Sequence, residues 1–309
     1  MTNASGTSGT RIADYWLHEE VLARSTEVAY RATHRMLPRC ARVAILKPAF
    51  VGFRHAEVQL MREACVLETM HHSGVPRVFE CGVFERGPWV ATEHIAGTSI
   101  EDASAERPLP IGDALAVLRD AAAILAHAHH RGVVHRDITP RTIVRTAERG
   151  FPVCITGWGD ASLHDGPLPR LDDPGARFYR APELADRDHG DGLADVFALG
   201  AVMFEAATLV LPEPVQKFPG VPAAFHQLLA SMLERAPADR PTAAGVHAEA
   251  ARLAELHVDG DAAIEEVEVE LVDISRAQAA MSNLGWMPPE QLVSARSQTL
   301  GALRRRKEP

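Results

Sequence analysis

The sequence is poor in lysine and cysteine and contains no long hydrophobic run. Only three of the 32 basic residues are lysines, Lys47, Lys217 and Lys307, so chemistry that needs a lysine in the first half of the chain must use Lys47. The four cysteines lie far apart without metal-ligand spacing, which is typical of a reduced, cytoplasmic compartment. No apolar run reaches the roughly 18 residues of a membrane-spanning helix, and the first dozen residues do not resemble a secretion signal. We therefore expect no disulfides and no membrane partner.

The composition is that of a globular chain with a sizeable core. Of the 309 residues, 46% are hydrophobic and 24% are charged. The formal charge of −9 argues against a protein that binds nucleic acid through a general basic surface. The expected partners are therefore not nucleic acids, and the oligomeric state stays open.

The hydrophobic patterns predict a β-rich lobe followed by a helical lobe, an α+β fold. Residues 1–12 are expected to form a flexible tail. The β-rich lobe covers residues 13–94 and the helical lobe residues 95–256, and Gly132 ends the first long helix as a cap. Strands are expected at 42–46, 77–79, 88–92, 132–135 and 151–155, helices at 55–70, 111–131, 193–207, 222–234 and 242–256, and a loop at 160–176.

A C-terminal appendage, residues 257–309, differs in composition from the rest. Seven acidic residues and no lysine or arginine lie between His257 and Asp273, and apolar residues alternate with glutamates there. The alternation favours a strand, and a helix remains an alternative. Two interpretations are open for the appendage, a solvated extension or a segment that docks a partner.

Several motifs occur in a fixed order along the chain. His135-Arg136-Asp137 is followed by Tyr179-Arg-Ala-Pro-Glu183, by a helix that carries Asp195, and by Asp239-Arg240-Pro241. Upstream, Glu63 lies on the first helix and Thr92-Glu93 lies between the lobes. Over residues 14–256 this series resembles the eukaryotic-type Ser/Thr protein kinases. The resemblance implies a bilobal protein kinase fold.

The resemblance also implies roles for individual residues. Asp137 would be the catalytic base, with Arg136 beside it. Glu183 and Arg240 would form a buried ion pair, and Asp195 would accept hydrogen bonds from the catalytic loop. The nucleotide-binding positions would be Ala44, Lys47, Glu63, Thr92 and Glu93.

The parts that bind phosphate in kinases are missing. Residues 21–30, in the place of the glycine-rich loop, contain no glycine, and Glu27 adds a negative charge. Leu46 stands where the phosphate-binding lysine is expected, and Lys47 follows one position late. Because side chains alternate along a strand, Leu46 shares the cleft face with Ala44, and Lys47 would point away unless a bulge intervenes. Glu63 would then lack its usual partner.

The metal-binding parts are missing too. Thr142 replaces the catalytic-loop asparagine and Thr139 the loop lysine, and Gly157 stands in the position of the metal-binding aspartate. Asp160 lies three residues later, and we expect it to be an exposed loop residue; the alternative is that it reaches into the site. Ser162 is the one Ser or Thr between Gly157 and Glu183, so loop phosphorylation is not expected. The histidines at 127, 129, 130 and 135 favour loop and cap roles over a metal site.

Two functional hypotheses follow. The first is a pseudokinase, a regulatory or scaffolding protein that binds protein partners, needs no cofactor and no magnesium, and binds ATP weakly if at all. In such a protein Asp137 would keep the position of the base without taking part in catalysis. The second is a divergent, active ATP-dependent Ser/Thr protein kinase that uses Lys47 and Asp160 as displaced replacements.

Overall fold

The computed structural model describes residues 10–85, 87–147, 149–163, 178–186, 191–211 and 220–259. The chain divides into two units, residues 1–263 and 264–309, and the fold described below belongs to the first. Most of the appendage predicted at 257–309, including its alternating segment, therefore lies outside the described residues.

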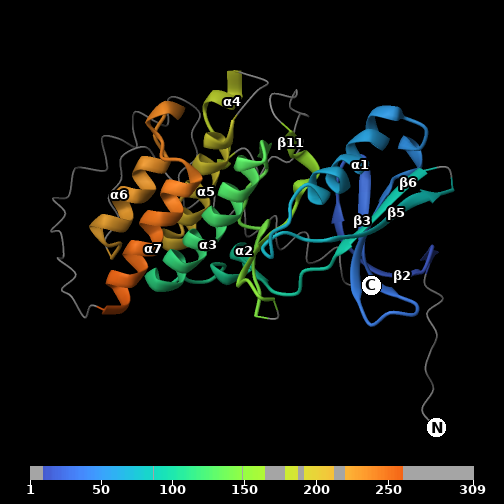
Figure 1. Cartoon of the computed structure of the whole chain (residues 1–309), viewed down its shortest axis with the longest axis horizontal. Helices are drawn as coiled ribbons and strands as arrows, with labels where there is room; N and C mark the ends of the chain where they lie inside the picture. Colours follow the sequence, from blue (N-terminus) through green and yellow to red (C-terminus); the bar gives the residue numbers. More distant parts are fainter. Residues whose placement is uncertain are drawn as a thin grey trace, which may run out of the picture. The chain divides into compact units, whose positions relative to one another are not determined.

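The N-terminal lobe is an antiparallel sheet with one long helix, α1 (Arg54–Glu68), against it (Figure 1). The strand order is β1-β2-β3-β4-β6-β5. A short 3-10 helix, η1 (Pro48–Phe50), connects β4 to α1. The strands are β1 (Arg11–Ile12), β2 (Tyr15–Ala23), β3 (Glu27–His34), β4 (Cys40–Leu46), β5 (Val78–Phe84) and β6 (Gly87–Glu93).

The start of this lobe differs from the prediction of a tail over residues 1–12. Arg11 and Ile12 form a strand that pairs with β2, and Ile12 is fully buried beside Tyr15 and Leu17. Residues 1–9 lie outside the described part. The ordered fold begins earlier because an apolar residue there completes a core cluster of the sheet.

The C-terminal lobe is built from helices around α3 (Ile111–His130) and α5 (Gly192–Thr208). Both helices are largely buried, and α7 (Ala243–Asp259) packs along α3 (Figure 1). The remaining helices are α2 (Ile100–Ala103), η2 (Trp158–Asp160), α4 (Glu183–Asp186), α6 (Ala223–Met232) and η4 (Pro237–Asp239). Short strands complete the lobe: β7 (Thr98–Ser99), β8 (Val133–Val134), β9 (Ile143–Arg145), β10 (Val153–Ile155) and β11 (Ser162–Leu163).

The predicted helices and strands agree with this architecture, and the α+β bilobal kinase fold is confirmed. The first long helix ends as predicted, because Gly132 adopts a φ of 71° in the left-handed region that glycine enters without steric cost. The loop expected at 160–176 is partly wrong, since η2 and β11 occupy its beginning. Residues 164–177 of that loop lie outside the described part.

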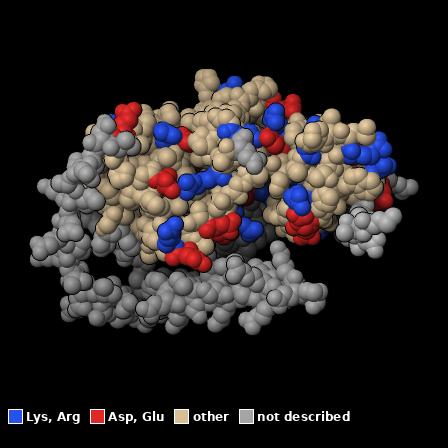
Figure 2. All heavy atoms as spheres, turned by 90° about the horizontal axis from the view of Figure 1, so that it is seen from below, with Lys and Arg blue, Asp and Glu red and all other residues tan. Residues whose placement is uncertain are grey.

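The described helices include none that is long and apolar enough to cross a membrane. Figure 2 shows acidic and basic side chains interspersed on one face of the molecule, with no single basic field on that face.

Candidate nucleotide cleft and catalytic loop

The catalytic loop is held by Asp195 at the start of α5. One carboxylate oxygen accepts a hydrogen bond from the backbone N–H of His135 at 2.7 Å, and the other accepts one from the N–H of Arg136, also at 2.7 Å. His129 lies 2.9 Å from the same carboxylate. Arg136 has a φ of 70°, a costly conformation for a residue with a Cβ, so these bonds stabilise a strained turn.

Asp195 stays ionised despite complete burial. Burial pushes the pKa of this carboxyl up, but hydrogen bonds from His129 and from the backbone of Arg136 outweigh it, so the pKa is lowered. The hydrogen bonds that Asp195 was predicted to accept from the catalytic loop are formed.

His135 is fully buried and neutral. Its Nε2 lies 3.0 Å from the carbonyl oxygen of Thr156, and its Nδ1 accepts a hydrogen bond from the N–H of Asp137 at 3.2 Å. This pattern assigns the proton to Nε2. Burial lowers the pKa of His135, and its ring packs edge-on against Trp158. His135 is therefore a structural part of the loop, and the ring fixes the Asp137 backbone.

The ion pair predicted between Glu183 and Arg240 is formed in two parallel contacts, of 2.7 and 2.8 Å. Arg240 also donates to the carbonyl oxygens of Glu234, Leu193 and Arg235. The guanidinium thus joins the start of α4, the start of α5 and the segment before η4.

The cleft face of β4 is apolar at the position of the missing lysine. Leu46 and Ala44 are buried in one cluster with Leu60 of α1, as the strand alternation predicts. Lys47 follows the end of β4 and is the N-cap residue of η1. Among the ion pairs formed within the described residues, none includes Lys47.

Glu63 nevertheless has a cationic partner, which corrects the prediction that it would lack one. Its carboxylate lies 3.0 Å from Nη1 of Arg42, which stands on the same face of β4 as Ala44. The second terminal nitrogen of Arg42 lies 3.7 Å from Glu27. An arginine four residues before Leu46 thus provides the positive charge.

Asp160 also departs from the prediction of an exposed loop residue. It is 4% exposed at the end of η2, and its Oδ2 lies 2.9 Å from Nη1 of Arg24. Arg24 lies in the turn between β2 and β3, so it comes from the opposite lobe. Its other terminal nitrogen lies 3.5 Å from Oδ2 of Asp137. One guanidinium therefore bridges Asp137 and Asp160.

Glu27 sits in the same cluster and is buried instead of facing a nucleotide from an open loop. Burial raises its pKa, and repulsion by Glu63 raises it further. For Arg24, burial alone would lower the pKa, but Asp160 and the other carboxylates raise it overall, so the guanidinium stays charged. Two guanidiniums here face four carboxyl groups, those of Glu27, Glu63, Asp137 and Asp160.

The hydroxyl of Thr142 is engaged in hydrogen bonds within its own loop. The hydroxyl of Thr142 donates to the carbonyl oxygen of Thr139 at 3.0 Å and accepts from its N–H at 3.0 Å. Gly157 has a φ of 83° and offers no side chain. Among the described residues, no group of three or more His, Cys, Asp or Glu side chains is placed to hold a metal ion.

The hinge is tied to both lobes by Glu93. Its carboxylate forms ion pairs with Arg149 at 2.5 Å and with Arg77 at 3.2 Å. Arg149 donates in addition to the carbonyl oxygen of Ser73. Thr92, just before it, is 2% exposed and pairs with Arg42 across the sheet. Sequence reasoning located the hinge but missed the arginines that fix it.

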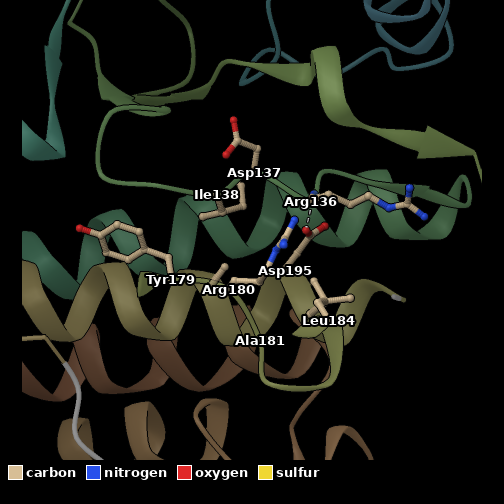
Figure 3. Close-up of a pocket in the computed structure, with 10 residues that line it drawn as sticks. Arg136, Asp137, Ile138, Tyr179, Arg180, Ala181, Leu184 and Asp195 are labelled. Atoms are coloured by element: carbon tan, nitrogen blue, oxygen red, sulfur yellow. Dashed lines mark hydrogen bonds between the residues drawn. The ribbon is translucent and has the colours of Figure 1, made fainter. Parts of the chain in front are cut away.

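A small cavity lies on the side of the catalytic loop that faces Asp195 (Figure 3). Its lining comes from the loop and from the segment Tyr179–Leu184, with Asp195 at its base. In Figure 3 the Asp137 carboxylate points to the opposite side of the loop from Asp195. A volume of about 20 Å³ has room for about one water molecule.

Residues 52–250, more than half of the chain, match the family described as protein kinase domain. The chain belongs to the protein kinase family. It is 28% identical over 272 residues to the serine/threonine-protein kinase PknJ of Mycobacterium tuberculosis, a match that covers 80% of this chain and 46% of PknJ. The serine/threonine-protein kinase PknI of the same species is 26% identical over 249 residues, 75% of this chain and 40% of PknI. The chain thus spans less than half the length of these relatives.

A crystal structure of the PknI kinase domain from Mycobacterium tuberculosis superimposes with a TM-score of 0.60 at 25% identity, covering 82% of this chain and all of that domain.

In this kinase fold, Ser162 forms part of β11 and is buried, so its hydroxyl is not presented for modification. Of the four histidines considered from the sequence, His129 and His135 act in the catalytic-loop network.

Proposed function

We propose that this kinase-family chain is a pseudokinase: a regulatory or scaffolding protein that binds protein partners and transfers no phosphate. The observation that carries the proposal is the position of Leu46. Its side chain is 5% exposed in an apolar cluster on the cleft face, where phosphoryl transfer needs a cation on the nucleotide phosphates. A leucine in that environment neither binds nor orients a phosphate.

The metal-binding positions support the same proposal. Transfer requires magnesium held by an aspartate and an asparagine, and here Gly157 and Thr142 occupy those places. Asp137 keeps its place as a base, but a base without positioned phosphate and metal has nothing to act on. The proposed function requires no cofactor. Weak ATP binding without magnesium, against Ala44 and the hinge at Glu93, is compatible with it.

A phosphate-transfer assay tests this proposal. The full chain is incubated with ATP and magnesium, and separately with manganese, together with a Ser/Thr peptide library, and incorporation into chain and peptides is followed by mass spectrometry. We expect no incorporation above that of Asp137→Ala. Incorporation by the wild type that requires the metal and disappears in Asp137→Ala would contradict the proposal.

A second candidate is a divergent, active Ser/Thr kinase, the activity named for PknJ and PknI. The burial of Asp160 beside Asp137 favours it, because a carboxylate has moved into the cleft from three residues away. In the same assay, this candidate requires metal-dependent transfer that Asp160→Asn and Lys47→Ala each abolish. Transfer unchanged in both variants would exclude this arrangement.

A further inference from the structure

The guanidinium of Arg24 contacts two carboxylates of the cleft at the same time. It contacts Asp160 at 2.9 Å and Asp137 at 3.5 Å. The side chain starts in the β2–β3 turn, where the backbone N–H of Arg24 donates to the carbonyl oxygen of Glu27 at 2.9 Å. An arginine of one lobe thus neutralises carboxylates of the other.

With Arg24 in place, the surrounding residues fit a guanidinium and offer few free ligands to magnesium. Gly157 supplies no oxygen ligand from a side chain, and the Thr142 hydroxyl is bound within its own loop. Magnesium needs oxygen ligands in near-octahedral geometry, commonly one or two carboxylates together with substrate phosphates. The carboxylates present, Asp137 and Asp160, already face a positive charge, and a second cation in the same space would repel the first.

Gly159 leaves the room that the guanidinium uses. A Cβ at this position would lie 2.9 Å from Nη1 of Arg24, too close for both to remain in place. The φ of Gly159 is outside the left-handed region, so the backbone itself does not require glycine here. The absence of a side chain therefore serves the approach of Arg24.

We propose that Arg24 takes the place of the metal and is the residue that excludes magnesium nucleotides from this cleft. The inference goes beyond the proposed function, since a protein that transfers no phosphate can still bind magnesium and ATP. With Arg24 in place, the turn between β2 and β3 is fixed to the helical lobe without ligand. Without Arg24, Asp137 and Asp160 lose the guanidinium that they share, and carboxylates are the protein groups through which a magnesium nucleotide is commonly bound.

The test compares the wild type with Arg24→Ala, with Arg31→Ala as the matched control. Arg31 is also an arginine of the N-terminal lobe in an ion pair, with Glu19, but it lies on the surface. Thermal unfolding and calorimetry are measured with EDTA, with magnesium alone, with ATP in EDTA, and with ATP and magnesium. We expect magnesium-dependent ATP binding to be at least about tenfold tighter in Arg24→Ala than in wild type and control, which corresponds to a midpoint rise of roughly 2–3 °C for a chain of this size.

Gly159→Ala provides a variant that keeps every charge. Because the added Cβ would clash only with the flexible end of Arg24, we expect the fold to persist while the guanidinium is displaced, with a smaller gain in magnesium-dependent binding than in Arg24→Ala. Equal responses to magnesium and ATP in wild type, Arg24→Ala and Gly159→Ala would overturn the proposal. Weaker ATP binding in Arg24→Ala would also overturn it, since Arg24 would then be a phosphate ligand. Neither outcome bears on phosphate transfer, which the assay above measures separately.

Discussion

Asp195 and Arg240 of the helical lobe bind backbone groups as well as side chains, whereas the guanidinium of Arg24 in the cleft is held by side-chain carboxylates. A backbone N–H or carbonyl has a fixed place once the helices pack, so its partner must come from one particular position. A cluster of charged side chains can be assembled from residues at several sequence positions, provided that each positive group lies next to negative ones. Arg42 and Asp160 illustrate this freedom, since each lies a few residues from the place where a kinase has its lysine or its aspartate.

This difference explains which motifs the chain shares with kinases. The family residues Asp195 and Arg240 persist where a charged side chain binds the backbone, whereas the lysine and the metal-binding aspartate of the cleft are replaced by residues at other positions. Both cations of the cleft cluster are arginines, and Arg42 is the one that contacts Glu63 in place of a lysine. The planar guanidinium contacts two carboxylates at once, as Arg24 does with Asp137 and Asp160, and a lysine ammonium does so less readily.

The largest expected effect belongs to the helical lobe. Arg240→Ala removes one half of a pair that is almost completely buried and leaves the Glu183 carboxylate and three carbonyl oxygens without their donor. We expect a loss of about 3–5 kcal/mol in the free energy of unfolding. Urea unfolding followed by circular dichroism measures it, and a loss below about 1 kcal/mol would show that the backbone contacts do not matter as argued.

A smaller effect is expected in the cleft. Arg42→Ala leaves Glu63 without its 3.0 Å partner and increases its repulsion with Glu27, at an expected loss of about 1.5–3 kcal/mol. Adding Glu27→Gln to Arg42→Ala is expected to restore part of that stability, because one of the two carboxylates no longer carries charge. The same urea experiment on the single and double variants measures this coupling. A double variant less stable than Arg42→Ala would contradict a role of repulsion.

The smallest effect is a difference in pH dependence between the two regions. Burial lowers the pKa of His135, so below about pH 6.5 the unfolded chain takes up a proton that the folded chain refuses, and stability falls on acidification by at most about 1.4 kcal/mol per pH unit. Burial and Glu63 raise the pKa of Glu27, so the folded chain takes up this proton first. Glu27 therefore adds to the free energy of unfolding as the pH falls from the raised pKa of its carboxyl group towards the usual pKa of glutamate.

Unfolding free energies measured between pH 7.5 and 4.5 separate the two contributions. His135→Gln is expected to flatten the loss on acidification, and Glu27→Gln to steepen it. The pKa values of His72, His94 and His127 are also lowered by burial, and their contributions cancel when each variant is compared with the wild type. If unfolding free energy depended on pH in the same way in the wild type, His135→Gln and Glu27→Gln, both assignments would be contradicted.

The sequence was sufficient for the fold and for the network around Asp195. The motifs of the helical lobe stand at family spacing, and the helices that carry them have clear apolar faces. The hairpin of β2 and β3 was not predicted as strands, because β2 has polar residues at several consecutive positions and lacks the alternation that marks a half-buried strand.

The cleft cluster could not be predicted from local patterns, because its partners are far apart in the chain. Asp160 looked like an ordinary loop acid, and nothing near it in sequence indicates Arg24. One clue was available in the composition. With Lys47 the single lysine of the first half, arginines had to provide any other positive charge that the buried carboxylates of the cleft required.

The contact between Arg24 and Asp160 joins residues 136 positions apart, one in each lobe. Chains of this size fold through intermediates in which compact parts form first, and contacts of long sequence separation form late. The ion pair between the lobes is therefore expected to be absent from the folding transition state. Its free energy then acts on the rate of unfolding rather than on the rate of folding. Arg24 thereby lengthens the lifetime of the assembled cleft without helping the chain to reach it.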